Sequence, residues 1–266
     1  MRRTLANKRF VVTGASSGIG RELAAQLVAK GNHVLALARR EERLQQLAQQ
    51  LNDASGTLAY LSGDLTASDF HNRILEWTNQ HWQGSVDGLI NNAGIGSIGR
   101  FAESNQTAVR QVMEINFFAA VELIRALLPA LRQGQQPVIC NIGSVLGHAA
   151  MPGKSEYCAS KFALHGFTDA LRMELRAEQL DVVLVSPSTT RSEFFESVIH
   201  GAHPQTRGMS AAQVARQSLK AIERGQRERI LSSGGRLLVL LDRIVPGLLS
   251  RAITSWYQRQ TVKDGE

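Results

Sequence analysis

Tyr157 and Lys161 are the two residues whose types and spacing best suit proton-transfer chemistry. They stand four positions apart in a stretch that opens a predicted helix, so both side chains point the same way. The pKa of a free phenol is about 10, and a nearby ammonium brings it towards neutral pH, as general acid–base catalysis requires. Taken alone, such a pair is more typical of an amphipathic helix face, so the catalytic hypothesis depends on the motifs around it.

A glycine-rich turn at residues 13–20 supplies the second motif. It follows the apolar run 10–12 and precedes the helical stretch 21–27, so the loop ends at a helix N-terminus. Glycines leave no Cβ in the way of a phosphate, and the N–H groups and helix dipole favour a pyrophosphate there. No Gly-Lys-Ser/Thr closes the motif, which excludes a nucleoside-triphosphate P-loop. The turn predicts a dinucleotide site that includes Gly14, Ser16, Ser17, Gly18, Ile19 and Gly20.

Arg39 is the predicted determinant of cofactor choice. It is the first residue after a second predicted strand, 34–38, about twenty residues beyond the glycines, where a dinucleotide fold binds the ribose. An acidic side chain there accepts from a free 2′-hydroxyl, whereas an arginine can hold a 2′-phosphate. Glu41 and Glu42 fit the solvated start of a helix over 40–51. The sequence therefore favours NADP(H) over NAD(H).

Alternating strands and helices must position these motifs. Further strands are predicted at 57–61, 86–90, 137–142, 181–185 and 229–231, and further helices at 68–80, 104–131 and 155–178. This alternation predicts an α/β fold with a doubly wound parallel sheet, which binds ligands beyond the carboxyl ends of its strands. Asp64 follows one such end. It either accepts a hydrogen bond from an adenine amine or, like Thr66, caps the next helix.

Joined to the segment Asn91-Asn92-Ala93-Gly94, to Asn116 and to Ser144, these motifs resemble the short-chain dehydrogenase/reductase family. The resemblance covers residues 9–230. It implies a Rossmann-type fold with a seven-stranded parallel sheet and a nicotinamide cofactor. It also implies a catalytic tetrad of Asn116, Ser144, Tyr157 and Lys161. The further cofactor contacts that it implies are Asp64, Leu65, Asn91, Ala93, Gly94, Tyr157, Lys161, Pro187 and Ser192.

The resemblance assigns a role to each member of the tetrad. Tyr157 would exchange the proton with the substrate oxygen while the nicotinamide transfers hydride to or from its carbon. Lys161 would bind the nicotinamide ribose and lower the pKa of Tyr157. Ser144 would hold the substrate oxygen, and Asn116 would position a water that links Lys161 to solvent.

Three positions depart from the family pattern. Ser188 stands where the family usually has a glycine after the sixth strand, and Ser192 replaces a threonine. Serine keeps a hydroxyl for the cofactor, so binding is expected to survive. Members that prefer NADP often carry a basic residue where this chain has Ser17. The expected NADP preference therefore rests mainly on Arg39.

The segment 187–210 is expected to cover the substrate. Its apolar residues suggest a lipophilic substrate, although core packing explains them nearly as well. His148 is expected to line the pocket without a catalytic role. The predicted pocket residues are Ser144, Leu146, His148, Met151 and Phe194.

The chain is predicted to divide into a catalytic domain, residues 1–232, and a C-terminal amphipathic helical extension, residues 233–266. The apolar run 236–249 is interrupted by Asp242-Arg243 and Pro246, well short of the roughly twenty residues that span a membrane. Either the extension is an amphipathic surface helix pair that contacts an anionic membrane, or it packs on its own domain or a sister subunit.

Composition limits the partners. The net charge is +7, but the basic residues are scattered without a basic, aromatic strip, which argues against nucleic acid. The two cysteines, Cys140 and Cys158, suggest reduced thiols, and no apolar signal sequence follows Met1. A cytoplasmic protein is therefore expected, and association with a membrane stays open. No metal site is predicted.

By resemblance, the helices 104–131 and 155–178 pair across a two-fold interface, so a homo-oligomer is expected.

The leading hypothesis is an NADP(H)-dependent oxidoreductase that interconverts a carbonyl and an alcohol. The first alternative is a 3-oxoacyl thioester reductase, for which the positive charge would suit an acidic carrier protein. Such reductases, however, usually end soon after the seventh strand, whereas this chain continues. A remote alternative is a non-catalytic dinucleotide-binding regulatory protein, but its expected signature is a lost tetrad residue, and all four are present.

Overall fold

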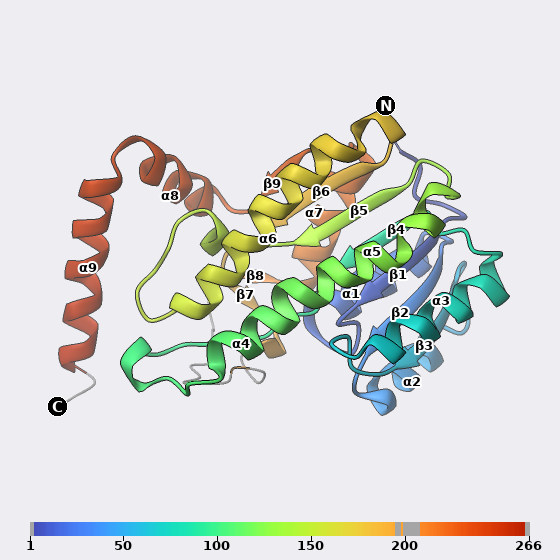
Figure 1. Cartoon of the computed structure of the whole chain (residues 1–266), viewed down its shortest axis with the longest axis horizontal. Coiled ribbons are helices and arrows are strands. Elements are labelled where there is room, and N and C mark those ends of the chain that lie inside the picture. Colours follow the sequence, from blue (N-terminus) through green and yellow to red (C-terminus); the bar gives the residue numbers. More distant parts are fainter. Residues whose placement is uncertain (1–2, 195–197, 199–207, 264–266) are drawn as a thin grey trace.

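The chain folds around one parallel sheet of seven strands (Figure 1). The computed structural model describes residues 3–194, 198 and 208–263. The strand order is β3-β2-β1-β4-β5-β6-β9, and each neighbouring pair is parallel, which confirms the predicted doubly wound sheet. The strands are β1 (Arg9–Thr13), β2 (His33–Ala38), β3 (Thr57–Ser62), β4 (Gly88–Asn91), β5 (Val138–Ile142), β6 (Asp181–Ser186) and β9 (Glu228–Ile230).

Helices cover both faces of the sheet because its strands are apolar on both sides. Val12 and Val34 belong to a core with one set of helices, whereas their neighbours Val11 and Leu35 belong to a second core on the opposite face. The first set is α1 (Gly18–Ala29), α2 (Glu41–Gln50) and α7 (Ala211–Glu223). The second set is α3 (Ser68–Trp82), α5 (Ala119–Arg132) and α6 (Ser155–Glu174).

The order of the strands reverses between β1 and β4. From β1 the chain proceeds outward to β2 and β3, and it then returns to place β4 on the other side of β1. Connections leave the two strands in opposite directions at this point, so a crevice opens beyond their carboxyl ends. The sheet therefore brings residues 13–20 and the segment after β4 to the same edge.

The predicted helix 104–131 begins at residue 108 in the structure and contains a π-helical turn. It consists of α4 (Ala108–Met113), a π-helical turn (Glu114–Phe118) and α5. A π-helical turn inserts a residue into the helix and is frequent at functional sites. Here the wide turn carries Asn116, whose side chain bonds the backbone of Ile95 rather than pointing to solvent.

The C-terminal residues form α8 (Ser233–Ile244) and α9 (Pro246–Lys263), as the amphipathic pattern predicts. α8 packs closely on the domain, since a Cβ on Gly235 would lie 2.7 Å from Val145. α9 stands at the outer edge of the molecule (Figure 1), where Tyr257 reaches the turn at Gly153. The division of the chain at residue 232 stays a prediction. Within the described ranges, no helix is long and apolar enough to cross a membrane.

Candidate active site

The glycine turn has the shape that a close approach to phosphate requires. Gly14 and Gly18 have φ angles of 66° and 53°, in the left-handed region that favours glycine. A Cβ on Gly20 would collide with the carbonyl oxygen of Gly14, so the turn lies directly against the first turn of α1. Ser17 is the N-cap residue of α1 but makes no side-chain cap hydrogen bond. The first-turn N–H groups thus lack a side-chain cap at the wall of the crevice.

Two arginines flank this turn. Arg39, which the sequence singled out, is exposed at the end of β2 and lines the cavity. Arg40 was missed. Its guanidinium donates to Ser16 Oγ, at 3.1 and 3.2 Å, and to Ser17 Oγ at 2.7 Å. Its position next to Arg39 is the available signal in the sequence.

A single cavity of about 790 Å³ joins the glycine turn to Tyr157. It contains most of the predicted site residues, although they lie far apart in the sequence. Those predicted for the cofactor are Gly14, Ser16, Ser17, Gly18, Ile19, Arg39, Asp64, Leu65, Ala93, Gly94, Tyr157, Lys161, Pro187 and Ser192. Those predicted for the substrate are Ser144, Leu146, Met151 and Phe194.

Asp64 does not cap α3 in the way the alternative interpretation expected. Its Oδ1 accepts from the N–H and the hydroxyl of Thr66, at 3.0 and 2.9 Å. The N-cap residue of α3 is Ala67, which has no side-chain cap. Asp64 is exposed and faces the cavity, where a carboxylate oxygen can accept from a ligand.

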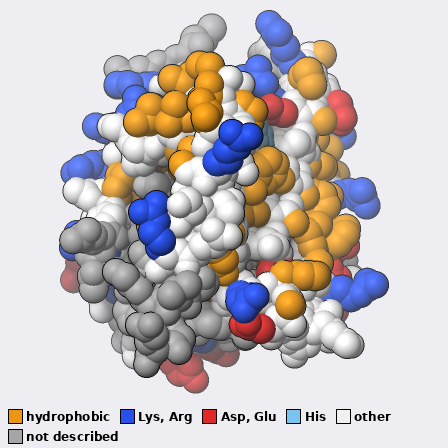
Figure 2. Space-filling model, turned by 90° about the vertical axis from the view of Figure 1, so that its left-hand side faces the viewer, with side chains coloured by type: hydrophobic (Ala, Val, Ile, Leu, Met, Phe, Trp, Pro, Cys, Tyr) orange, Lys and Arg blue, Asp and Glu red, His pale blue; other side chains and the backbone are white. Residues whose placement is uncertain are grey.

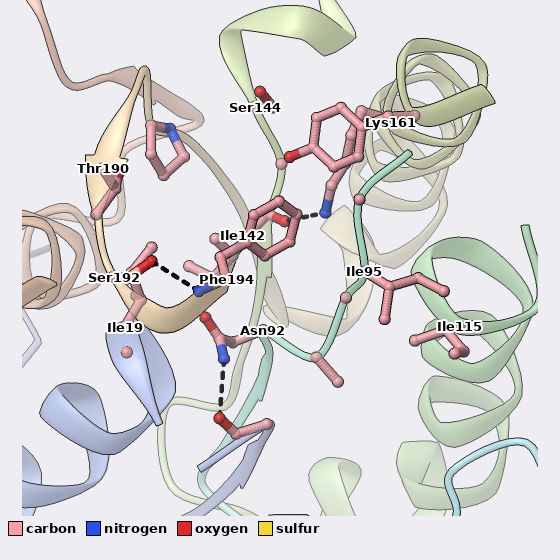
Figure 3. A pocket seen from close by; sticks show the side chains of 18 of the residues that line it. Ile19, Asn92, Ile95, Ile115, Ile142, Ser144, Lys161, Thr190, Ser192 and Phe194 are labelled. Carbon is pink, nitrogen blue, oxygen red and sulfur yellow. Dashed lines mark hydrogen bonds between the residues drawn. The ribbon is translucent and has the colours of Figure 1, made fainter. Parts of the chain in front are cut away.

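Two residues predicted to contact the cofactor support the cavity from behind. Gly20 does not line it and instead allows α1 to approach the turn. Asn91 is buried, and its amide donates to Asn141 Oδ1 at 2.9 Å. The neighbouring Asn92, for which no role is predicted, does line the cavity (Figure 3). Its amide donates to the carbonyl oxygen of Thr13 at 3.0 Å.

The placement of His148 in the substrate pocket is wrong. Its Nε2 lies 3.0 Å from Ser186 Oγ and 2.9 Å from Glu228 Oε1, and its ring packs on His165 with 4.1 Å between centroids. These partners draw the imidazole away from the cavity, which it does not line. Spacing after a strand did not reveal which way this side chain turns.

Lys161 occupies the centre of the candidate active site (Figure 3). It is 4 % exposed, and Nζ donates to the carbonyl oxygen of Ile142 at 3.0 Å. The same ammonium lies 5.7 Å from the ring centroid of Tyr157. Asn116 stands behind them, because its Nδ2 donates to Ser160 Oγ at 2.9 Å and to the carbonyl oxygen of Ile95. Asn116 therefore ties the loop after β4 to the helix that carries Tyr157 and Lys161.

Burial shifts the pKa values of Tyr157 and Lys161 in opposite directions. Burial raises the pKa of Tyr157 to about 12. A hydrogen bond with Ser144 acts in the opposite direction but has the smaller effect. Burial lowers the pKa of Lys161 to about 8. The expectation that Lys161 lowers the pKa of Tyr157 is therefore wrong for the protein alone, since the loss of hydration on burial dominates and outweighs the hydrogen bond with Ser144.

The end of the cavity beyond Tyr157 is mostly apolar. α8 contributes Gly234, Gly235 and Leu238 to its wall, so the C-terminal extension forms part of the pocket, which the sequence did not indicate. Of the predicted covering segment 187–210, residues 195–197 and 199–207 lie outside the described residues. The other apolar side chains of this end are Ile95, Ile98, Ile115, Val145, Leu146, Met151 and Phe194.

Comparisons with known proteins agree with this geometry. The family model described as short chain dehydrogenase matches residues 8–202. The chain is 31 % identical to the dehydrogenase/reductase SDR family member 7B of Bos taurus, over 96 % of this chain and 83 % of that protein.

Solved structures are also similar. A short-chain dehydrogenase from Sphingobium yanoikuyae in complex with NADPH is 28 % identical, with a TM-score of 0.77, and the match covers 91 % of this chain and 95 % of that one. A short chain dehydrogenase/reductase from Burkholderia phymatum in complex with NAD has a TM-score of 0.81 at 24 % identity, over 90 % and 94 % of the two chains. At that identity the second likeness shows the fold alone.

The raised pKa of Tyr157 leads to a testable titration. An ordinary tyrosine is half ionised at a pH of about 10, whereas a phenol with a pKa of about 12 is about 1 % ionised there. Phenolate absorbance is measured from pH 6 to 10 for the wild type and for Tyr157→Phe, which leaves Tyr60 and Tyr257. The difference between the two curves should stay flat. A step in the difference curve between pH 7 and 9 would show instead that Lys161 lowers the pKa of Tyr157.

Proposed function

The chain belongs to the short-chain dehydrogenase/reductase family, and on that basis we propose an NADP(H)-dependent oxidoreductase that interconverts a carbonyl and an alcohol on a lipophilic substrate. The observation that carries the proposal is the convergence of Ser144, Tyr157 and Lys161 on one cavity with the glycine turn. A proton-transfer group and a phosphate cradle in one cavity suit a reaction in which a proton and a hydride reach adjacent atoms.

The cradle fits a nicotinamide dinucleotide. The glycine turn leaves room for the pyrophosphate at the start of α1, and the exposed carboxylate of Asp64, which lines the same cavity, can accept a hydrogen bond from the adenine amine. Arg39 and Arg40 offer guanidinium groups for a 2′-phosphate. When bound, the cofactor supplies or accepts the hydride.

The protein's own residues handle the proton. Because the pKa of Tyr157 is about 12, its phenol stays protonated near neutral pH and can donate to a carbonyl oxygen. The hydroxyl of Ser144 is the second donor for that oxygen. Lys161, with a pKa of about 8, is mostly protonated at pH 7 and favours the phenolate left after transfer. Asn116 is a positioning residue, since it fixes the loop and helix on either side of Lys161.

The acid–base role of Tyr157 is tested with NADPH and a panel of ketones, aldehydes and 3-oxoacyl thioesters. Tyr157→Phe keeps the ring but removes the transferable proton, so kcat should fall by about 10²-fold or more with cofactor affinity nearly intact. Lys161→Ala should reduce both turnover and cofactor affinity. Substantial turnover by Tyr157→Phe would contradict the mechanism. Preference for thioesters would favour the 3-oxoacyl alternative, and cofactor binding without turnover of any substrate would favour the regulatory one.

The NADP preference is tested by Arg39→Asp. The carboxylate repels a 2′-phosphate and accepts from a free 2′-hydroxyl, so the ratio of kcat/KM for NADPH to that for NADH should fall at least tenfold and reverse. Arg40→Ala should weaken NADPH binding without favouring NADH, because it removes a cation and adds no acceptor. If the wild type has an equal or higher kcat/KM with NADH than with NADPH, the proposed preference for NADP(H) is contradicted.

The extension is proposed to contact an anionic membrane surface. Exposed apolar side chains gather on α8 and the start of α9, and we call this group the C-terminal apolar surface: Leu237, Leu240, Leu241, Ile244 and Leu248. Exposed Arg236, Arg243 and Arg251 accompany it. Figure 2 shows hydrophobic side chains interspersed with basic ones on this side of the molecule. Apolar contact combined with basic charge is typical of interfacial helices.

Co-sedimentation with anionic vesicles tests this contact. The full chain should pellet at low salt, and Leu240→Ser with Ile244→Ser should pellet several-fold less. These two changes leave the pocket residues Gly235 and Leu238 in place, unlike a truncation. Phe101→Ser, an equally exposed apolar site outside the surface, is the matched control and should behave as the wild type. If the wild type stays in the supernatant at low salt, the extension is a packing element.

A homo-oligomer is proposed through a second apolar face. Val109, Phe118, Phe162 and Met173 are exposed on α4, the π-helical turn and α6. Light scattering at micromolar concentration should give at least twice the mass of the chain, and Phe118→Glu should shift the mass towards that of one chain. A wild-type monomer at that concentration would rule the assembly out.

A further inference from the structure

Lys154 is a cation in the cavity that the proposed mechanism does not use. It is the N-cap residue of α6, three positions before Tyr157, and it lines the cavity near Met151. In the described part of the chain its ammonium has no hydrogen-bond or ion-pair partner. Lys154 is only partly exposed, and this burial lowers the pKa of its ammonium, against a smaller opposing effect of the Cys158 thiol.

The position of Lys154 is unfavourable for a positive charge. The N-terminus of a helix carries the positive end of the helix dipole, so a cation there is repelled. The nearest acid along the chain, Glu156, is buried but does not line the cavity and forms no ion pair with it. A negatively charged ligand group at this place would compensate both the ammonium and the helix N-terminus.

Each other charged side chain that lines the cavity either lies at the proposed cofactor site or has a hydrogen-bond partner in the protein. Arg39, Arg40 and Asp64 lie at the ends of β2 and β3, at the ribose and adenine end of the proposed cofactor site. Lys161 is bound to the carbonyl oxygen of Ile142. Among the described lining residues, Lys154 is thus the one charged group left at the apolar end.

We propose that Lys154 binds an anionic head group of the substrate, so that the substrate is an amphipathic molecule with an apolar body. This assignment rests on the proposed reductase function. Lys154 and Tyr157 line the same cavity at the start of α6, so one substrate molecule can place its anionic group at Lys154 and its carbonyl at Tyr157. The hydrocarbon part lies against the apolar lining that Ile98, Ile115 and Leu238 contribute.

Matched substrates test this assignment. A series of medium-chain oxo-carboxylates, with the ketone two to five carbons from the carboxylate, is compared with the corresponding methyl esters, which have the same ketone but no charge. For the best member, wild-type kcat/KM with NADPH should favour the acid by about tenfold or more, as expected for a charge-assisted hydrogen bond. Lys154→Met should reduce this acid-to-ester ratio at least tenfold, and Lys154→Arg should largely preserve it.

The control is Lys220→Met, which removes an exposed lysine from α7 and should leave the ratio unchanged. A wild-type preference for the esters, or an unchanged ratio in Lys154→Met, would overturn the assignment while leaving the reductase function intact. Calorimetry with the NADP⁺ complex separates the two proposals without turnover. The same carboxylate should bind at least tenfold more weakly to Lys154→Met than to the wild type, and equal affinity would also overturn the role of Lys154.

Discussion

A lysine ammonium buried beside a phenol is the constraint on which the rest of this site depends. Loss of hydration disfavours whichever form is charged, so the same burial lowers the pKa of Lys161 to about 8 and raises that of Tyr157 to about 12. Both groups therefore keep their protons near neutral pH. That state suits donation of a proton to a carbonyl oxygen, after which the ammonium stabilises the phenolate that remains.

Holding that ammonium requires contributions from segments far apart in the chain. The carbonyl oxygen of Ile142, at the end of β5, accepts its hydrogen bond. Gly94 leaves space beside it, since a Cβ there would lie 3.0 Å from Asn116 Oδ1 and 3.7 Å from Lys161 Nζ. The π-helical turn places Asn116 where it joins this loop to α6. The parallel sheet brings these pieces to one edge, which is why the chemistry depends on the whole fold.

Features that depend on local sequence patterns, such as the sheet and the glycine turn, could be predicted from the sequence. Features that depend on the direction of a side chain could not. The sheet and the glycine turn were predictable because apolar runs alternate with helical stretches and Gly14 and Gly18 need their left-handed conformations. The direction of His148 was not, because Ser186 and Glu228, which hold its ring, follow it by many residues. The entry of α8 into the pocket wall was missed for a similar reason, since packing of Gly235 on Val145 leaves no periodic signal.

Deuterium transfer tests most directly whether this cavity performs carbonyl reduction. The protein is incubated with NADPH deuterated at both C4 positions and a lipophilic ketone, and the alcohol is examined by mass spectrometry. The wild type should place one deuterium on the carbinol carbon, and Tyr157→Phe should give almost no labelled alcohol. An alcohol without deuterium, or no alcohol from any carbonyl compound while NADPH binds tightly, would contradict a hydride-transfer function for this site.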